Sequence, residues 1–156
     1  MNSGKKSGAL IGFGQVAQKA HAPAFLNNPD FQIVAAADSS PARLAAAGNF
    51  FPGLRGYPTA EALLQTEASL DFVVIATPPA FHAQQTLLAL RRGLHVLCEK
   101  PLTWNISELN EIRWQAASIG RVVFTVNNWA HSALWLKAQE LVAGGSIGDV
   151  RHAELH

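Results

Sequence analysis

A short segment near the start of the chain combines glycines and a small residue in a pattern suited to binding phosphate. Residues 12–17 read Gly-Phe-Gly-Gln-Val-Ala, the pattern G-x-G-x-x-A. In this pattern Gly12 permits a tight turn, Gly14 lets the backbone approach a pyrophosphate, and Ala17 lets a helix pack closely on a strand. The free N–H groups at the start of that helix would face the phosphates. A purely structural glycine-rich turn has the same letters, so the flanking elements decide between the two readings.

One acidic residue stands where a dinucleotide site needs it. Asp38 follows Gly14 by 24 residues, close to the spacing of about 20 expected for the residue that binds the adenosine ribose. Its carboxylate would accept hydrogen bonds from both ribose hydroxyls and repel a 2′-phosphate, which favours NAD over NADP. Ser39 and Arg43 could instead serve a 2′-phosphate, so NADP stays possible. A turn or capping role is the alternative for Asp38, because Ser-Ser-Pro follows it.

The distribution of apolar residues places both motifs at the ends of buried strands. Short apolar runs alternate with longer amphipathic ones, which is typical of β-α-β units and a parallel sheet. The expected strands are 9–11, 31–37, 54–57, 71–76, 95–98 and 121–126, and the expected helices are 15–28, 41–49, 60–65, 80–92, 105–119 and 131–142. The glycine pattern then follows the first strand, and Asp38 follows the second. The sequence therefore predicts an α/β fold with a doubly wound parallel sheet, the Rossmann fold.

Individual residues predict details of these helices. Pro23 is expected to break or kink the first helix, because proline lacks an N–H and clashes with the preceding turn. Asn105 and Glu108 are expected to form a capping box at the start of the helix over 105–119. Gly93 follows the helix over 80–92 and suits the left-handed conformation that ends a helix.

The last part of the chain predicts the beginning of a second domain. Residues 1–127 would form the dinucleotide-binding domain, and residues 128–156 a linker helix and a first strand, since 150–155 begin to alternate as a strand does. An uncovered sheet edge invites aggregation, so this segment either pairs within the chain or belongs to a longer protein. We favour the longer protein, whose C-terminal α/β substrate domain is absent here or only begun.

Composition and charge exclude several classes of function. The chain has 156 residues, of which 49% are hydrophobic and 15% charged, enough for one domain with a buried core. Its net charge of +1 offers no basic surplus for nucleic acid or an anionic membrane. No apolar run approaches the roughly 20 residues of a spanning helix, and no signal peptide is recognised. Cys98 is the only cysteine and is expected to be buried and inert, which favours a cytoplasmic protein without a disulfide. No cysteine–histidine cluster has zinc spacing, so no metal site is expected.

Two further segments carry a resemblance to a known family. Residues 73–82 read V-V-I-A-T-P-P-x-x-H, and residues 95–101 read H-V-L-C-E-K-P. Together with the glycine pattern and the H-x-P of His21 and Pro23, they make the chain resemble the N-terminal half of the Gfo/Idh/MocA oxidoreductases, which include glucose–fructose oxidoreductase and inositol dehydrogenase. The likeness covers residues 9–155.

This resemblance implies particular roles for residues of this chain. Lys100 is the expected catalytic residue: it would hydrogen-bond the substrate hydroxyl that is oxidised, where an ammonium stabilises a developing alkoxide. Pro101 would fix where Lys100 points, and the bond between them is often cis in the family. An ordinary surface lysine is the alternative, and a packing or capping role is the alternative for His82. The cofactor-binding residues that the resemblance implies are Gly12, Phe13, Gly14, Gln15, Val16, Asp38, Ala76, Thr77, Pro78, His82, Glu99, Lys100 and Asn128.

The implied function is that of an NAD(P)-dependent oxidoreductase. Hydride would pass between nicotinamide and a hydroxyl-bearing carbon of a sugar, cyclitol or polyol. A non-catalytic dinucleotide-binding module or redox sensor is the alternative. Family members often carry an arginine or tyrosine after the sixth strand, in a segment like G-x-N-x-R, whereas residues 127–131 read Asn-Asn-Trp-Ala-His. Asn128 matches, but the arginine is missing and the substrate class stays open. The resemblance also implies a homo-oligomer at full length, and this chain alone is expected to bind cofactor without turnover.

Overall fold

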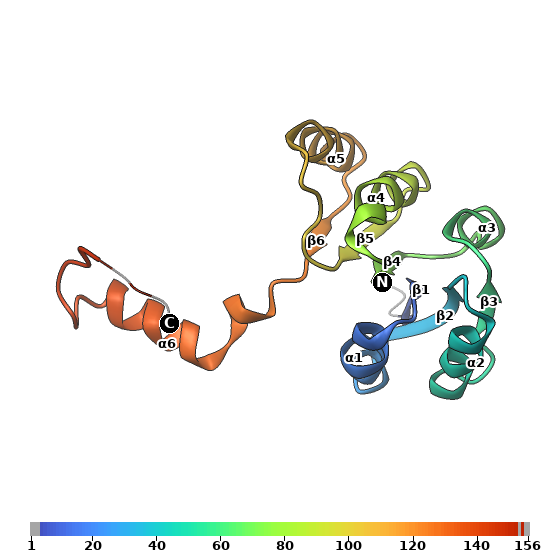
Figure 1. Cartoon of the computed structure of the whole chain (residues 1–156), viewed down its shortest axis with the longest axis horizontal. Helices are drawn as coiled ribbons and strands as arrows, with labels where there is room; N and C mark the ends of the chain where they lie inside the picture. The colour runs from blue at the N-terminus through green and yellow to red at the C-terminus, as the bar shows by residue number, and fades with distance from the viewer. Residues whose placement is uncertain (1–3, 153, 155–156) are drawn as a thin grey trace. The chain divides into compact units, whose positions relative to one another are not determined.

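Six parallel strands organise the first part of the chain. The structure is a computed structural model that describes residues 4–152 and 154, and the chain divides into two units, 1–126 and 127–156. Within the described part of the first unit, the strand order is β3-β2-β1-β4-β5-β6 (Figure 1). The direction in which the chain adds strands reverses between β1 and β4, so the predicted doubly wound Rossmann sheet is confirmed.

The elements follow the predicted alternation closely. The strands are β1 (Lys6–Ile11), β2 (Phe31–Ala37), β3 (Arg55–Tyr57), β4 (Phe72–Ile75), β5 (His95–Cys98) and β6 (Val123–Thr125). The helical segments of this unit are η1 (Ala17–His21), α1 (Ala22–Leu26), α2 (Pro41–Phe50), α3 (Ala60–Thr66), η2 (Pro79–Phe81), α4 (His82–Arg91) and α5 (Ile106–Ser118). Gly93 has a φ of +72° after α4, as expected of a helix terminator. β1 begins three residues earlier than predicted, because Lys6 and Ser7 pair with β2 although they are polar.

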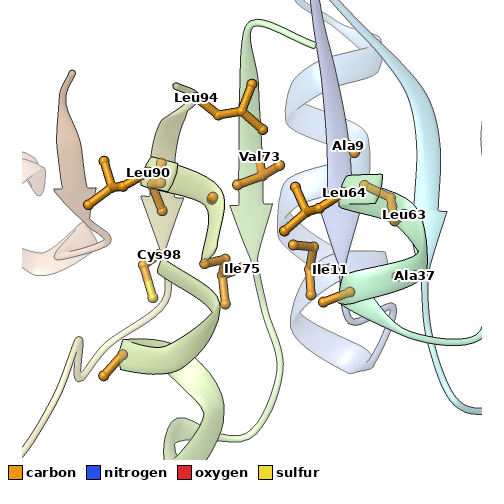
Figure 2. Close-up of a cluster of buried hydrophobic side chains, with 14 of the residues drawn as sticks. Ala9, Ile11, Ala37, Leu63, Leu64, Val73, Ile75, Leu90, Leu94 and Cys98 are labelled. Atoms are coloured by element: carbon orange, nitrogen blue, oxygen red, sulfur yellow. The ribbon is translucent and has the colours of Figure 1, made fainter. Parts of the chain in front are cut away.

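Helices cover both faces of this sheet. In Figure 1, α1 and α2 lie on one side, and α3, α4 and α5 lie on the other. Alternate residues of β1 therefore enter different cores: Leu10 packs with α1 and α2, while Ala9 and Ile11 pack with the other three helices. Figure 2 shows the second of these cores, in which Leu63 and Leu90 are fully buried. Each such aliphatic side chain contributes about 1.5–3 kcal/mol by leaving water.

The first helix continues through Pro23 instead of breaking there. Helical backbone runs from residue 15 to residue 26, but η1 is a π-helical segment that ends two residues before the proline. The Ala22 N–H donates to the carbonyl of Ala17, five residues back. This wider turn accommodates the proline ring, which would clash with the carbonyl four residues back in an α-helix. The predicted break is therefore wrong and the helix widens just before Pro23, while the alternative, a kink, stays a prediction.

The start of α5 confirms Asn105 as the residue that caps the helix, but not the two reciprocal bonds of the predicted capping box. The Asn105 side chain accepts a hydrogen bond from the Ser107 N–H at 2.8 Å. The Asn105 N–H, however, donates to the Thr103 hydroxyl at 2.9 Å, and that hydroxyl donates to the Glu108 carboxylate. Thr103 thus stands between the two residues that a capping box would join directly, so the predicted Glu108 contact is wrong.

The second unit, residues 127–156, contains helices among its described residues. They are η3 (Asn128–His131) and α6 (Ala133–Ala143). The Ser132 hydroxyl accepts the Trp135 N–H at 3.2 Å, which sets the start of α6 two residues after the predicted 131. The strand expected over 150–155 is wrong for residues 150–152 and 154, which pair with no other strand; residues 153 and 155 lie outside the described residues. That this unit begins a substrate domain stays a prediction.

Candidate cofactor site

The loops that follow four neighbouring strands stand in one row at the carboxyl edge of the sheet. They begin with Asp38 after β2, Gly12 after β1, Ala76 after β4 and Glu99 after β5. Three N–H groups in this row donate to the last carbonyl of the adjacent strand over 2.7–2.9 Å: Gly12 to Ala37, Ala76 to Ile11 and Glu99 to Ile75. Open α/β sheets bind ligands at this edge, where the strand order reverses.

A cavity of about 610 Å³ opens along this row. It is bordered by the glycine loop, the ends of β2 and β4, and the first turn of α4. The predicted cofactor residues that line it are Gly12, Gly14, Gln15, Val16, Asp38, Ala76, Thr77 and Pro78. Ser39 and Arg43, which bear on the choice between NAD and NADP, line it as well. The volume lies within the usual range for small-molecule sites.

The two glycines of the loop have different surroundings. Gly12 has a φ of +88°, and a Cβ there would lie 2.8 Å from the backbone carbon of Ala76 and 2.9 Å from the nitrogen of Thr77. A Cβ on Gly14 would meet nothing within 4 Å, although this residue borders the cavity. Gly12 therefore lets the loop after β1 pass close to the loop after β4, while Gly14 leaves open space at the start of a helix. This arrangement fits the diphosphate of a dinucleotide.

Asp38 has the turn and capping contacts weighed for it, and it also borders the cavity. Its side chain is buried at the cavity wall, and its carboxylate accepts the Phe13 N–H at 2.8 Å and the Ser40 N–H at 2.9 Å. The Arg43 guanidinium lies 3.7 Å from the same carboxylate. The carboxylate thus fixes the glycine loop against the end of β2. Phe13 does not line the cavity: its N–H is bonded to Asp38, and its ring is buried against Phe50.

His82 lies between two loops and does not line the cavity. The ring is 1% exposed, with Nδ1 2.7 Å from the carbonyl oxygen of Pro101 and Nε2 2.8 Å from that of Thr77. It therefore joins the loop after β4 to the loop that carries Lys100. The packing alternative describes this arrangement better than a side chain that lines the cofactor.

Glu99 and Lys100 follow β5, one strand beyond the loop that starts at Ala76. They are not among the cavity residues. Lys100 is exposed, and its bond to Pro101 is cis, as the resemblance implied. One Glu99 carboxylate oxygen accepts the Lys100 N–H at 3.3 Å, and the other lies 2.9 Å from Nε2 of His21. Sequence reasoning gave His21 no role, although it noted the H-x-P pattern. Asn128 belongs to the second unit, and its role stays a prediction.

A comparison with known families gives this geometry its context. A family model described as "Oxidoreductase family, NAD-binding Rossmann fold" and designated GFO_IDH_MocA matches residues 6–127. The chain belongs to the Gfo/Idh/MocA oxidoreductase family. The resemblance inferred from the glycine pattern, A-T-P-P-x-x-H and E-K-P is therefore confirmed.

Individual members of the Gfo/Idh/MocA family match over nearly the whole chain. D-Glucoside 3-dehydrogenase of Escherichia coli is 30% identical over 142 residues, which are 91% of this chain and 40% of the relative. The crystal structure of myo-inositol 2-dehydrogenase from Lactobacillus plantarum superposes with a TM-score of 0.86 at 26% identity, covering 94% of this chain and 43% of the other. Scyllo-inositol dehydrogenase from Lactobacillus casei, solved with NAD(H) and scyllo-inositol, gives a TM-score of 0.84 at 25% identity over 94% and 43% of the two chains.

These matches cover most of this chain but less than half of each similar protein. This Gfo/Idh/MocA chain spans about two fifths of the length of the relatives that it matches. Among the residues that the structure describes, no helix is long and apolar enough to cross a membrane.

The single cysteine of this Gfo/Idh/MocA chain is placed for packing and not for reactivity. Cys98 is fully buried at the end of β5, as predicted, and burial raises the pKa of its thiol to about 12. Because the thiolate is the reactive form, we expect Ellman's reagent at about pH 8 to label the folded chain at least about 100-fold more slowly than the urea-unfolded chain. Rapid stoichiometric labelling of the folded chain would show instead that the thiol is accessible and ionised.

Proposed function

We propose that the whole protein is an NAD(P)-dependent oxidoreductase and that this chain is the part that binds the dinucleotide. The observation that carries the proposal is the row of loops at one edge of the sheet. The glycine loop and Asp38 border a cavity there, and Lys100 follows β5, which lies two strands from β1 in the sheet. The backbone N–H groups of residues 14–16, at the start of the first helix, would hold the diphosphate. Those of Gly12 and Phe13 already donate to Ala37 and Asp38. When bound, the nicotinamide exchanges a hydride with the substrate carbon.

Lys100 would act on the substrate side of this row. Its ammonium would donate a hydrogen bond to the substrate oxygen and stabilise the negative charge that develops there as the hydride leaves. Glu99, fixed by its N–H to Ile75 and by its carboxylate to His21, supports the backbone from which Lys100 projects. Thr77 and Pro78 would form the wall of the site between the diphosphate and Lys100, and Asn128 would approach the nicotinamide amide. The proton of the hydroxyl would pass to a residue of the remaining protein.

Asp38 would hold the adenosine ribose and favour NAD over NADP. Its carboxylate already lies at the cavity wall, where it would repel a 2′-phosphate. The Asp38→Ala variant should bind NAD about 10- to 100-fold more weakly, since hydrogen bonds to a charged group contribute about 1.5–3 kcal/mol. The same variant should lose most of its preference for NAD over NADP. Isothermal titration with each cofactor measures both effects.

A second substitution of Asp38 separates its proposed role in ribose binding from its support of the glycine loop. Asp38→Ala also removes the acceptor of the Phe13 N–H, so it should lower the free energy of unfolding by about 1–3 kcal/mol. Asp38→Asn keeps an amide oxygen in that place and should restore much of the stability, but not the discrimination against NADP. An unchanged ratio of NAD to NADP affinity in both variants would remove Asp38 from the ribose site.

The substrate would be a sugar, a cyclitol or a related polyol. This class is supported by the names of similar proteins, a glucoside dehydrogenase and two inositol dehydrogenases. We further propose that the full-length protein is a cytoplasmic homo-oligomer; a single buried thiol suits a reducing compartment.

Turnover by the full-length protein tests the proposed activity. NAD and NADP are each offered with a panel of aldoses, glucosides, inositols and linear polyols, and reduction of the nicotinamide is followed by absorbance. We expect turnover with at least one ring polyol and a preference for NAD. Tight cofactor binding without turnover on any member of the panel would favour the alternative, a non-catalytic dinucleotide-binding module or redox sensor.

A further inference from the structure

We propose that His21 is a positioning residue for Lys100 and acts through Glu99. The proposal deepens the proposed function and rests on it, because it assigns to a residue of the phosphate-binding helix an effect on the catalytic lysine. His21 and Glu99 are 78 residues apart in the sequence, yet His21 Nε2 lies 2.9 Å from a Glu99 carboxylate oxygen.

This contact is a directional hydrogen bond that is largely shielded from solvent. The side chains of His21 and Glu99 are 9% and 14% exposed. A carboxylate oxygen only accepts, so the Nε2–H of the imidazole donates. Charge-assisted bonds of this kind are among the stronger ones in proteins, and a shielded carboxylate that loses its donor is costly. Replacing His21 by an apolar residue would therefore leave the Glu99 carboxylate without this donor and free to change rotamer.

The π-helical segment brings His21 to the end of β5. His21 is the last residue of η1, whose wider turn closes with the bond from the Ala22 N–H to the Ala17 carbonyl. One additional residue in the turn shifts the following side chains around the helix axis compared with a regular α-helix. Local widenings of this kind occur frequently at functional sites. Here the widened turn ends on the residue that bonds Glu99.

Glu99, which His21 holds in place, in turn restrains the backbone of Lys100. Its N–H donates to the Ile75 carbonyl at 2.9 Å, and its second carboxylate oxygen accepts the Lys100 N–H at 3.3 Å. The residue before Lys100 is therefore held by β4, by the first helix and by Lys100 itself. Because the first helix begins with the glycine loop, His21 joins the element that would hold the diphosphate to the turn that presents the ammonium.

The test compares two substitutions of His21 in the full-length protein. His21→Leu fills the space without a donor, whereas His21→Gln places an amide N–H₂ near the position of Nε2. We expect His21→Leu to lower kcat by about 10- to 100-fold, the order of loss that a misplacement of about 1 Å produces. The dissociation constant of NAD should change less than about threefold. His21→Gln should recover most of the lost kcat, and Ala20→Gln, an exposed change in the same segment, serves as the matched control.

Three kinetic or binding results would overturn the proposal: an unchanged kcat in His21→Leu, an equal loss of kcat in His21→Gln, or a loss of kcat matched by a loss of NAD affinity. The last would mean that His21 only maintains the helix. Hydrogen exchange of the peptide that contains Lys100, followed by mass spectrometry, keeps the test independent of activity. If the wild-type protein shows no turnover, the proposed activity fails, and His21 is then judged by exchange alone. Faster exchange in His21→Leu than in His21→Gln supports the restraint on Lys100, and equal exchange contradicts it.

Discussion

Replacing Lys100 with alanine in the full-length protein is expected to lower kcat by about 10²–10³-fold, the usual loss when one group that stabilises a developing oxyanion is removed. The dissociation constant of NAD should change less than about threefold. Lys100 is exposed on the loop after β5 and does not border the cavity beside the glycine loop, so the cofactor keeps its other contacts. Steady-state kinetics and calorimetric titration of the same preparations measure both quantities.

The Lys100→Arg variant serves as the control for this result. Arginine retains the positive charge, but its planar guanidinium differs in shape and in donor direction from an ammonium. It should therefore recover only part of the lost kcat. If NAD affinity falls together with kcat in Lys100→Ala, the lysine is a cofactor ligand, and its assignment to the substrate oxygen is wrong.

Alanine at Gly12 is expected to damage both the fold and the site. The residue has a φ of +88°, and its Cβ would lie 2.8 Å from the backbone of Ala76, a neighbour that cannot rotate away. A strained backbone of this kind costs about 1–3 kcal/mol, and forced overlap in a packed interior costs a similar amount. We expect Gly12→Ala to lower the free energy of unfolding by about 2–5 kcal/mol in urea titrations and to remove measurable NAD binding.

Alanine at Gly14 should separate the effect on stability from the effect on NAD binding. Its Cβ would meet no atom of the chain within 4 Å, so the free energy of unfolding should change by less than about 1 kcal/mol. The new methyl group would nevertheless occupy space where the backbone approaches the diphosphate. NAD affinity should fall by at least about 10-fold. Full NAD affinity in a well-folded Gly14→Ala variant would place the diphosphate elsewhere.

The row of loop residues could be predicted because it depends on local patterns and on one rule of topology. The largely apolar runs over 31–37 and 95–98 predicted both strands with their observed bounds. Since the carboxyl ends of parallel strands meet at one edge, the residues that follow each strand had to lie together. Gly12, Asp38 and Ala76 therefore line one cavity although they are far apart in the chain.

The hydrogen bonds that support these loop residues could not be predicted from local sequence patterns. The bonds of Asp38 to the Phe13 N–H and of Glu99 to His21 join residues 25 and 78 positions apart, and nothing in the spacing of residues reveals such a pair. His82 illustrates the same difficulty, because a histidine at a helix start gives no sign that it will contact Pro101. A competing hydrogen-bond partner can also replace a contact that a local motif predicts. At the start of α5, the Thr103 hydroxyl takes the place of the direct contact predicted between Asn105 and Glu108.

A crystal structure of the full-length protein with NAD tests most directly whether a dinucleotide lies along this sheet edge. We predict diphosphate oxygens within hydrogen-bond distance of the backbone N–H groups of residues 14–16 and adenosine ribose hydroxyls at the Asp38 carboxylate. The nicotinamide ring should lie beside the Lys100 ammonium. A dinucleotide bound away from the glycine loop, or one whose nicotinamide lies on the far side of the sheet from Lys100, would contradict the proposed function.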